Sequence, residues 1–314
     1  MRILVIGGSG FLGTNLTLRV LRESVSKVTL VDPANPHAFV KDHTKISWVG
    51  SGIENRDLLN DLVRDVDIIF NCASQSSHLI SIQNPLYDAQ VNAIGHLNLL
   101  EAVRQSNPNA VVVYPSTTTV MGKQDGLVLD ESYRETPLEI YSANKLASEK
   151  YSRVYHDVYG LKTILLRFPN LYGAFGKTEP EYGFINYFIS LAQRNQSIEV
   201  FGSGEQIRNV MYVEDAVDIL FKAALDARLF GRVYFATTPF HYSVADVAKE
   251  VVSVFGSGEV EFKPWPHLRN LIEVGSQKFS SHKLSAITGW HPQTNLRAGL
   301  EKTKAFFDTF VPAA

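Results

Sequence analysis

Cysteine is almost missing from this sequence, and its scarcity limits the kind of protein that the chain can be. Cys72 is the only cysteine among 314 residues, so no disulfide can form within the chain. A small secreted protein held together by disulfides is therefore excluded. Cys72 closes an apolar run, and we expect a small buried side chain there rather than a nucleophile.

A surplus of basic residues is also missing. Lysine and arginine number 30 against 32 aspartate and glutamate residues, and the net charge is −2. A chain with this balance has no basic excess to follow a nucleic-acid backbone, so nucleic acid is not an expected partner. The 9 histidines show no metal-ligand spacing, and no metal is expected.

Long hydrophobic runs are missing as well. No stretch reaches the roughly 18 apolar residues that a membrane-spanning helix needs. The apolar run at the N-terminus ends at Gly7, which is too early for the apolar core of a signal peptide. We therefore expect a cytoplasmic protein that makes no membrane contact.

What is present is an alternation of short β-branched runs with longer helical patterns. The expected strands cover residues 2–6, 27–31, 66–70, 110–114 and 163–167. The expected helices between them include residues 11–23, 85–104 and 140–159. This alternation predicts an α/β fold, a doubly wound parallel sheet with helices on both faces.

A glycine motif, Gly7-x-x-Gly10-x-x-Gly13, follows the first expected strand and opens the first helix. In this position Gly7 makes the tight turn, Gly10 admits a pyrophosphate close to the backbone, and Gly13 lets helix and strand pack closely. Asp32 ends the next strand, about 20 residues further on, where a carboxylate binds an adenosine ribose and repels a 2′-phosphate. The motif predicts NAD rather than NADP as the cofactor. An alternative is that Asp32 only caps the turn before Pro33.

A second constellation lies downstream. Tyr141 and Lys145 are four positions apart on one expected helix, so their side chains share a face. A lysine ammonium beside a tyrosine lowers the pKa of the phenol and lets it act as a base. Thr117 follows the fourth strand and is expected to bond the same substrate oxygen. Together these groups can remove a proton from an alcohol while a hydride passes from its carbon to a nicotinamide. The alternative is that Tyr141 is a packing residue, because the spacing Tyr-x-x-x-Lys also occurs by chance.

Beyond Asn170 strands and helices no longer alternate, and the sequence contains many glycines and predicted turns. We interpret this change as the start of a smaller C-terminal lobe that binds the substrate. The cofactor-binding domain is predicted over residues 1–171, and residues 212–238 return to it as a helix (213–227) and a strand (232–236). The lobe is predicted over residues 172–211 and 239–314, with three helical stretches in its tail, the last at 296–307.

The order of these motifs resembles that of extended short-chain dehydrogenases/reductases, in the branch of nucleotide-sugar epimerases, dehydratases and reductases. The resemblance covers nearly the whole chain and implies a Rossmann-type domain that binds NAD. The segments that carry it are 7–13, 71–74, 91–95, 115–122, 167–173, 200–204 and 208–215.

The resemblance implies roles for individual residues. It assigns catalysis to Thr117, Tyr141 and Lys145, of which the last two also contact the cofactor. The other residues that it places at the cofactor are Gly7, Gly10, Phe11, Leu12, Gly13, Asp32, Ile53, Cys72, Ala73, Ser74, Asn92, Ser116 and Phe168. The residues that it places at the substrate, a nucleotide-diphosphate sugar, are Thr118, Asn170, Val200, Arg208 and Arg269, with the two arginines on the diphosphate. His78 is added from its place in the loop after the third strand, where a surface histidine without a ligand is the alternative.

The sequence departs from the family pattern at places that bear on function. Gly52 stands where the family has an aspartate that holds the adenine amino group, which leaves the adenine site open. Thr118 and Thr119 stand where 4,6-dehydratases have an Asp-Glu pair, so water loss has no evident acid and base. The same positions argue against a decarboxylase, and small uncharged residues there resemble those of UDP-glucose 4-epimerases.

The expected function is therefore nucleotide-sugar epimerisation at C4, by transient oxidation to a keto-sugar and reduction by the same bound NAD. A nucleotide-sugar 4-ketoreductase, which would consume reduced cofactor, and a non-catalytic NAD-binding regulator on the same fold are the alternatives. The resemblance also implies a homodimer, joined by a four-helix bundle of residues 85–104 and 140–159 from each subunit.

Overall fold

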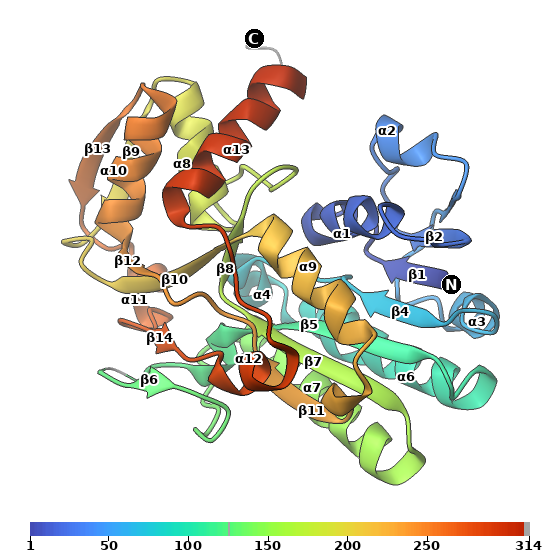
Figure 1. Cartoon of the computed structure of the whole chain (residues 1–314). Coiled ribbons are helices and arrows are strands. Elements are labelled where there is room, and N and C mark those ends of the chain that lie inside the picture. The colour runs from blue at the N-terminus through green and yellow to red at the C-terminus, as the bar shows by residue number, and fades with distance from the viewer. Residues whose placement is uncertain (125, 311–314) are drawn as a thin grey trace.

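The computed structural model describes residues 1–124 and 126–310. Its centre is a parallel sheet of seven strands in the order β11-β7-β5-β4-β1-β2-β3 (Figure 1). These strands are β1 (Arg2–Ile6), β2 (Lys27–Val31), β3 (Ile46–Val49), β4 (Ile68–Asn71), β5 (Val111–Thr117), β7 (Lys162–Phe168) and β11 (Arg232–Phe235). The strand order runs outward in both directions from β1 and β4, and ligands of such sheets bind at the carboxyl ends beside that switch point.

Helices cover both faces of the central sheet, because its strands are apolar on both sides. The helices of this part are α1 (Phe11–Leu21), α2 (Ala38–Lys41), α3 (Arg56–Leu62), α4 (His78–Gln83), α5 (Pro85–Ala89), α6 (Gly95–Ser106), α7 (Ile140–Tyr159) and α9 (Val213–Ala224). Leu16 of α1 and Leu220 of α9 share one buried cluster with the sheet. Leu59 of α3, Leu99 of α6 and Tyr155 of α7 belong to a second cluster on the other face.

The smaller lobe is built mainly from short sheets and helices of the second half of the chain, and β6 joins it from the first half. Its three-stranded sheet contains β8 (Asn170–Tyr172), β10 (Ile207–Tyr212) and β12 (His241–Ser243), while β9 (Ser197–Phe201) pairs with β13 (Glu259–Lys263) and β6 (Val128–Leu129) with β14 (Lys278–Phe279). Its helices are α8 (Phe184–Gln193), α10 (Val244–Phe255), α11 (His267–Leu271), α12 (His282–Thr288) and α13 (Leu296–Phe310). In Figure 1, α8, α10 and α13 gather with β9 and β13 at one side of the central sheet.

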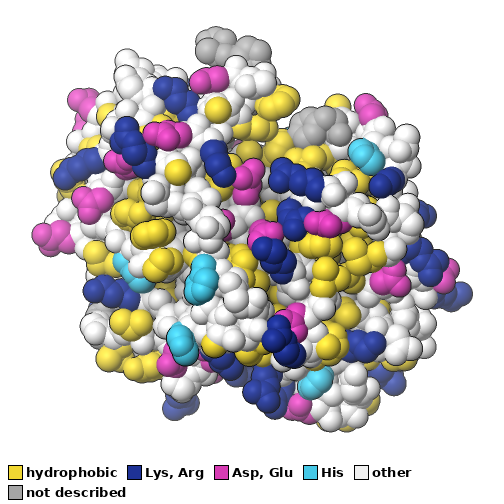
Figure 2. Space-filling model, viewed as in Figure 1, with side chains coloured by type: hydrophobic (Ala, Val, Ile, Leu, Met, Phe, Trp, Pro, Cys, Tyr) yellow, Lys and Arg dark blue, Asp and Glu magenta, His cyan; other side chains and the backbone are white. Residues whose placement is uncertain are grey.

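The surface is mixed in charge. On the face shown in Figure 2, basic and acidic side chains alternate over the whole view and form no large patch of one sign. Within residues 1–124 and 126–310, no helix combines the length and the apolar character needed to cross a membrane.

The predicted parallel sheet is confirmed, and residues 140–159 form a single helix as expected. Three expectations were wrong in detail. No strand was expected at β3, and the helix expected over residues 85–104 is interrupted by a π-helical segment, η1 (Gln90–Ile94). The described part of the tail, up to residue 310, contains four helices rather than three. The strand expected at 66–70 lies at Ile68–Asn71, and the last helix continues to Phe310.

Candidate active site

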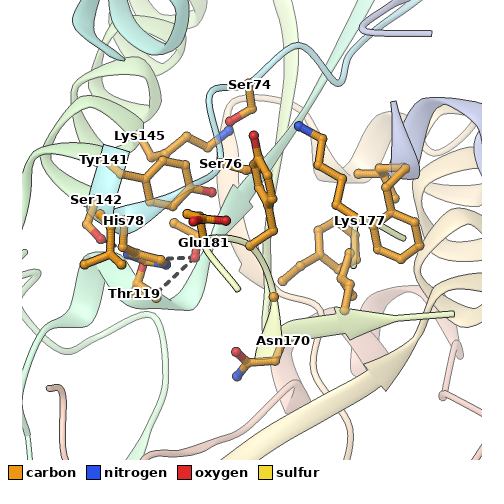
Figure 3. Close-up of a pocket in the computed structure, with 18 of the residues that line it drawn as sticks. Ser74, Ser76, His78, Thr119, Tyr141, Ser142, Lys145, Asn170, Lys177 and Glu181 are labelled. Atoms are coloured by element: carbon orange, nitrogen blue, oxygen red, sulfur yellow. Dashed lines mark hydrogen bonds between the residues drawn. The ribbon is translucent and has the colours of Figure 1, made fainter. Parts of the chain in front are cut away.

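A cavity of about 1050 Å³ lies between the carboxyl ends of the central strands and the smaller lobe. Its walls come from the segments that follow β1, β2, β4, β5 and β7 and from several segments of the lobe (Figure 3). Parallel strands end at one edge of the sheet, so residues far apart in sequence meet in this cavity. Every residue predicted at the catalytic, cofactor or substrate positions lines it, except Gly13 and Asn92.

The glycine loop between β1 and α1 is closely packed. A Cβ atom on Gly7, whose φ is +76°, would lie 2.5 Å from the backbone nitrogen of Ala73. A Cβ atom on Gly13 would lie 2.0 Å from the carbonyl oxygen of Gly7. A Cβ atom on Gly10 would meet nothing closer than 3.4 Å. Packing within the protein therefore requires glycine at positions 7 and 13. Packing does not require it at position 10, where a glycine would let a ligand approach the backbone.

Asp32 lies at the end of β2 and lines the cavity beside this loop. One carboxylate oxygen accepts a hydrogen bond from the backbone N–H of Ser9 at 3.1 Å, and the other accepts from the N–H of Ala34 at 2.9 Å. The carboxylate thus both caps the turn after β2 and places a negative charge next to the glycine loop.

Asn92 supports the cavity wall from behind. It lies in η1, is 1% exposed, and accepts a hydrogen bond from the Ser74 hydroxyl at 2.8 Å while donating to the carbonyl of Gln75 at 2.8 Å. Asn92, which was expected to contact the cofactor, therefore lies behind the residues that line the cavity. Its role in the structure is to hold Ser74, which does line the cavity.

The three predicted catalytic residues meet at the centre of the cavity. Tyr141 and Lys145 lie on α7, and Thr117 is the last residue of β5. Lys145 is 3% exposed, and its ammonium group donates to the carbonyl of Pro115 at 2.8 Å and lies 3.9 Å from the centroid of the Tyr114 ring. Burial lowers the pKa of Lys145 to about 7.

Tyr141 has an environment that holds its proton. Burial raises the pKa of its phenol, and the carboxylates of Glu139 and Asp88 raise it further, while hydrogen bonding with Ser74 and Thr117 acts in the opposite direction. The pKa of Tyr141 is thus raised in this structure, which is opposite to the lowering expected from Lys145.

Behind Thr117 the structure contains a chain of hydrogen bonds that the sequence did not reveal. Thr117 Oγ1 lies 2.9 Å from Thr119 Oγ1, which lies 2.8 Å from Ser142 Oγ. The Ser142 hydroxyl also bonds the carboxylate of Glu139, whose Oε1 lies 3.0 Å from Nδ1 of His78. Capping rules provide a sequence signal, because Glu139 precedes α7 and accepts hydrogen bonds from its first N–H groups. Nothing local connects it to His78.

The predicted diphosphate residues lie in the lobe side of the cavity. Arg208 of β10 forms an ion pair with Glu273 at 2.5 Å and donates to the carbonyl of Gly275 at 2.6 Å. Arg269 of α11 donates to the carbonyl of Pro180 at 2.9 Å. Both guanidinium groups are therefore held in place by protein acceptors at the cavity wall.

Comparisons with known proteins agree with this outline. The model of the NAD dependent epimerase/dehydratase family matches residues 3–234. The chain belongs to this family. It is 29% identical to a UDP-glucose 4-epimerase of Mycolicibacterium smegmatis over 98% of this chain and 98% of that protein. It is 31% identical to a putative UDP-glucose 4-epimerase of Methanocaldococcus jannaschii over 68% of this chain and 70% of that protein.

Among solved structures, the UDP-glucose 4-epimerase of Thermus thermophilus in complex with NAD superimposes with a TM-score of 0.86 at 26% identity, covering 99% of this chain and 100% of that one. The protein is accordingly an NAD-dependent enzyme of the extended short-chain dehydrogenase/reductase type, as the sequence predicted. The family also contains dehydratases: a human dTDP-D-glucose 4,6-dehydratase is 26% identical over 96% of this chain and 88% of that protein.

The cavity of this epimerase/dehydratase family member fits NAD. The free space above Gly10 suits a pyrophosphate at the start of α1, because the first backbone N–H groups of a helix have no partner within the helix. In the segment after β3, a Cβ atom on Gly52 would lie 2.1 Å from the carboxylate of Glu54. The glycine that departs from the family pattern thus makes room for a different carboxylate at the same wall of the cavity.

Proposed function

We propose that the protein is a nucleotide-sugar epimerase that inverts the hydroxyl group at C4. The observation that carries this proposal is the convergence of Thr117, Tyr141 and Lys145 on one cavity that also contains the dinucleotide loop. Relatives named UDP-glucose 4-epimerase match nearly the whole chain. Their names support C4 as the carbon that is inverted and a UDP-sugar as the substrate.

Each catalytic side chain has a distinct task. Tyr141, as its phenolate, takes the proton of the sugar hydroxyl, and the resulting phenol returns it once the keto-sugar has turned over. The positive charges of Lys145 and of a bound nicotinamide ring would together offset the burial that raises the pKa of Tyr141, and would so stabilise the phenolate. Thr117 bonds the same oxygen and aligns it with Tyr141. NAD supplies the reversible hydride acceptor, so no cofactor is consumed in a complete cycle.

The residues beside Thr117 favour epimerisation over elimination. Thr118 and Thr119 line the cavity with hydroxyl groups, and Thr119 is engaged by Thr117 and Ser142. Loss of water from the sugar needs an acid and a base close to the reacting carbons, and neither threonine supplies one.

The substrate is proposed to enter with its diphosphate at Arg208 and Arg269 and its sugar at Tyr141. Arg208 is paired with Glu273, so a bound diphosphate must replace that carboxylate or share the guanidinium with it. His78, Thr118 and Asn170 border the sugar end of the cavity.

A homodimer is proposed through α5, η1 and α7. Large apolar side chains on this side of the protomer are left exposed, and contiguous apolar surface marks an interface. The residues are Leu86, Tyr87, Ile94, Ile140, Val154, Val158 and Tyr159.

Incubation of the purified protein with a panel of nucleotide sugars tests the proposed function. Chromatography should detect the C4 isomer of one sugar, UDP-glucose or a relative, without any added reductant. If product appears only with stoichiometric reduced cofactor, the enzyme is a ketoreductase. If no sugar is converted under either condition, the proposed reaction is wrong.

A further inference from the structure

His78 and Glu139 form a pair at the cavity that the reaction outlined above does not use. His78 begins α4 and Glu139 precedes α7, and Nδ1 of His78 lies 3.0 Å from Oε1 of Glu139. The side chain of Glu139 is 4% exposed, whereas that of His78 is 40% exposed and lines the cavity. The imidazole therefore lies between a buried carboxylate and the space that the substrate enters.

The donors around Glu139 determine which nitrogen of His78 carries a proton. The carboxylate accepts from the backbone N–H groups of Tyr141 at 2.7 Å and Ser142 at 3.0 Å, and also from the Ser142 hydroxyl. A carboxyl group surrounded by donors is stable as the ionised acceptor. Burial raises the pKa of Glu139, but bonds and charge from His78 and bonds from Ser142 lower it by more. His78 must then donate to Glu139 from Nδ1–H.

The other ring nitrogen, Nε2, is consequently left for chemistry in the cavity. With Nδ1 protonated, Nε2 of the neutral imidazole has a lone pair and can accept a proton. In the part of the chain that the structure describes, no protein group bonds Nε2 of His78. A histidine held at Nδ1–H by a carboxylate is arranged as a general base, because the carboxylate fixes the tautomer and stabilises the imidazolium that forms.

This base lies next to the residue that is proposed to hold the reacting oxygen. The ring of His78 stands edge-on to that of Tyr141, with centroids 5.0 Å apart. In Figure 3, the two side chains lie on the same wall of the cavity, with Thr119 beside them. A sugar whose C4 oxygen is bonded by Tyr141 would thus place the carbons next to C4 in the neighbourhood of His78.

We propose that His78 is a second catalytic base, which removes a proton from a carbon next to C4 while the sugar carries a keto group at C4. This inference rests on the proposed function, because that reaction forms the keto group beside Tyr141. The C–H bond breaks and its proton goes to Nε2. The electron pair of that bond forms a C=C bond to C4, and the π pair of the carbonyl moves to the C4 oxygen. The reverse steps return a proton to the carbon.

Tyr141 can support the negative charge that forms on the C4 oxygen. It is a phenol at this stage, because it has taken the proton of the sugar hydroxyl, and a phenol donates to the oxygen of an enolate. Burial raises the pKa of Tyr141, which keeps that proton on the phenol. Exchange of hydrogen needs only the base, whereas loss of water would also need an acid at the leaving oxygen. The enzyme therefore acts at a carbon beside C4 as well as at C4 itself.

Solvent exchange tests this activity without the oxidation step. The probe is a nucleotide sugar that already has the keto group, UDP-4-keto-6-deoxyglucose, incubated in D₂O with the NAD-loaded protein. Proton NMR of the recovered sugar measures the loss of the signals at C3 and C5. The parent should exchange one of these hydrogens at least about a hundredfold faster than the sugar alone, since a positioned general base contributes about 10²–10⁴-fold.

His78→Asn removes the base but keeps a side-chain N–H donor for Glu139. It should lose about a hundredfold or more of the exchange rate, and it should bind NAD with the parental affinity, which shows that it folds. Ser81→Ala is the matched control, because Ser81 Oγ lies 3.1 Å from the other oxygen of Glu139 and the change leaves Nε2 of His78 in place. Its exchange rate should stay within about twofold of the parental rate.

The two proposals fail in different ways. If the parent exchanges no faster than the sugar alone, if His78→Asn exchanges like the parent, or if Ser81→Ala loses as much as His78→Asn, His78 is not a base. The inference is then wrong even when the parent inverts C4 of a sugar. If the parent exchanges the hydrogen and His78→Asn does not, but no nucleotide sugar is inverted at C4, the inference stands and the proposed reaction is wrong.

Discussion

Alanine at two positions of the glycine loop separates the roles of packing and cofactor binding. The Cβ of Gly13→Ala would lie 2.0 Å from the Gly7 carbonyl oxygen and 2.8 Å from the Gly8 Cα, and both of these atoms belong to the backbone. Forcing such a group into a packed site costs about 1–3 kcal/mol. Alanine within a helix stabilises the helix by up to about 1 kcal/mol relative to glycine, which offsets part of this cost. Because backbone atoms cannot rotate away from the clash, the packing cost lies in the upper part of its range, about 2–3 kcal/mol, and the net expectation for Gly13→Ala is a loss of about 1–2 kcal/mol in the free energy of unfolding.

Gly10→Ala is the matched variant, because its nearest neighbour lies at 3.4 Å. Alanine is a poorer N-cap than glycine, and the loss of stability should stay below about 1 kcal/mol. Its methyl group would occupy the space through which the pyrophosphate approaches the backbone, so NAD affinity should fall at least about tenfold, or about 1.4 kcal/mol.

Urea unfolding of the cofactor-free variants and calorimetric titration with NAD measure the two effects separately. The reasoning is refuted if Gly13→Ala is as stable as the parent. It is equally refuted if Gly10→Ala binds NAD with parental affinity.

Three further expectations follow from the same cavity. The Asp32 carboxylate would repel the 2′-phosphate of NADP, so the parent should bind NAD at least about tenfold more tightly than NADP. Asp32→Ala should reduce this ratio of the two affinities. Titration with both nucleotides measures the ratio, and equal affinity of the parent for both would contradict the prediction. Lys145→Met should abolish activity and also weaken NAD binding, since the resemblance places Lys145 on the nicotinamide ribose; unchanged NAD affinity would remove that second role. Val158→Asp, on the exposed apolar face of α7, should convert a dimer into a 35.0 kDa monomer in sedimentation, whereas the equally exposed Leu225→Asp should leave the dimer intact.

Much of the cofactor half of this protein could be predicted from sequence because its determinants are local. The glycines, the helix that follows them and Asp32 lie within one β-α-β unit, and their spacing alone fixes their order around a ligand. Tyr141 and Lys145 lie four residues apart on a helix, so their shared face follows from the helical repeat.

The parts that escaped prediction depend on contacts between distant segments. Glu139 and His78 are 61 residues apart and meet only because α4 packs against α7. The interruption of the helix at η1 is not visible in an apolar repeat, yet it carries Asn92 to the back of the cavity wall. The strand β3 is short and half-buried, so its pattern did not stand out from a loop.

The central claim is that Tyr141 moves the proton of the sugar hydroxyl, and Tyr141→Phe tests it most directly. The change removes only the phenolic oxygen. Conversion of the nucleotide sugar that the parent epimerises should be measured by chromatography on protein loaded with NAD. Tyr141→Phe should fold and bind NAD as the parent does, and it should form no isomer. Isomer formation at near the parental rate would show that Tyr141 is a packing residue and would contradict the mechanism.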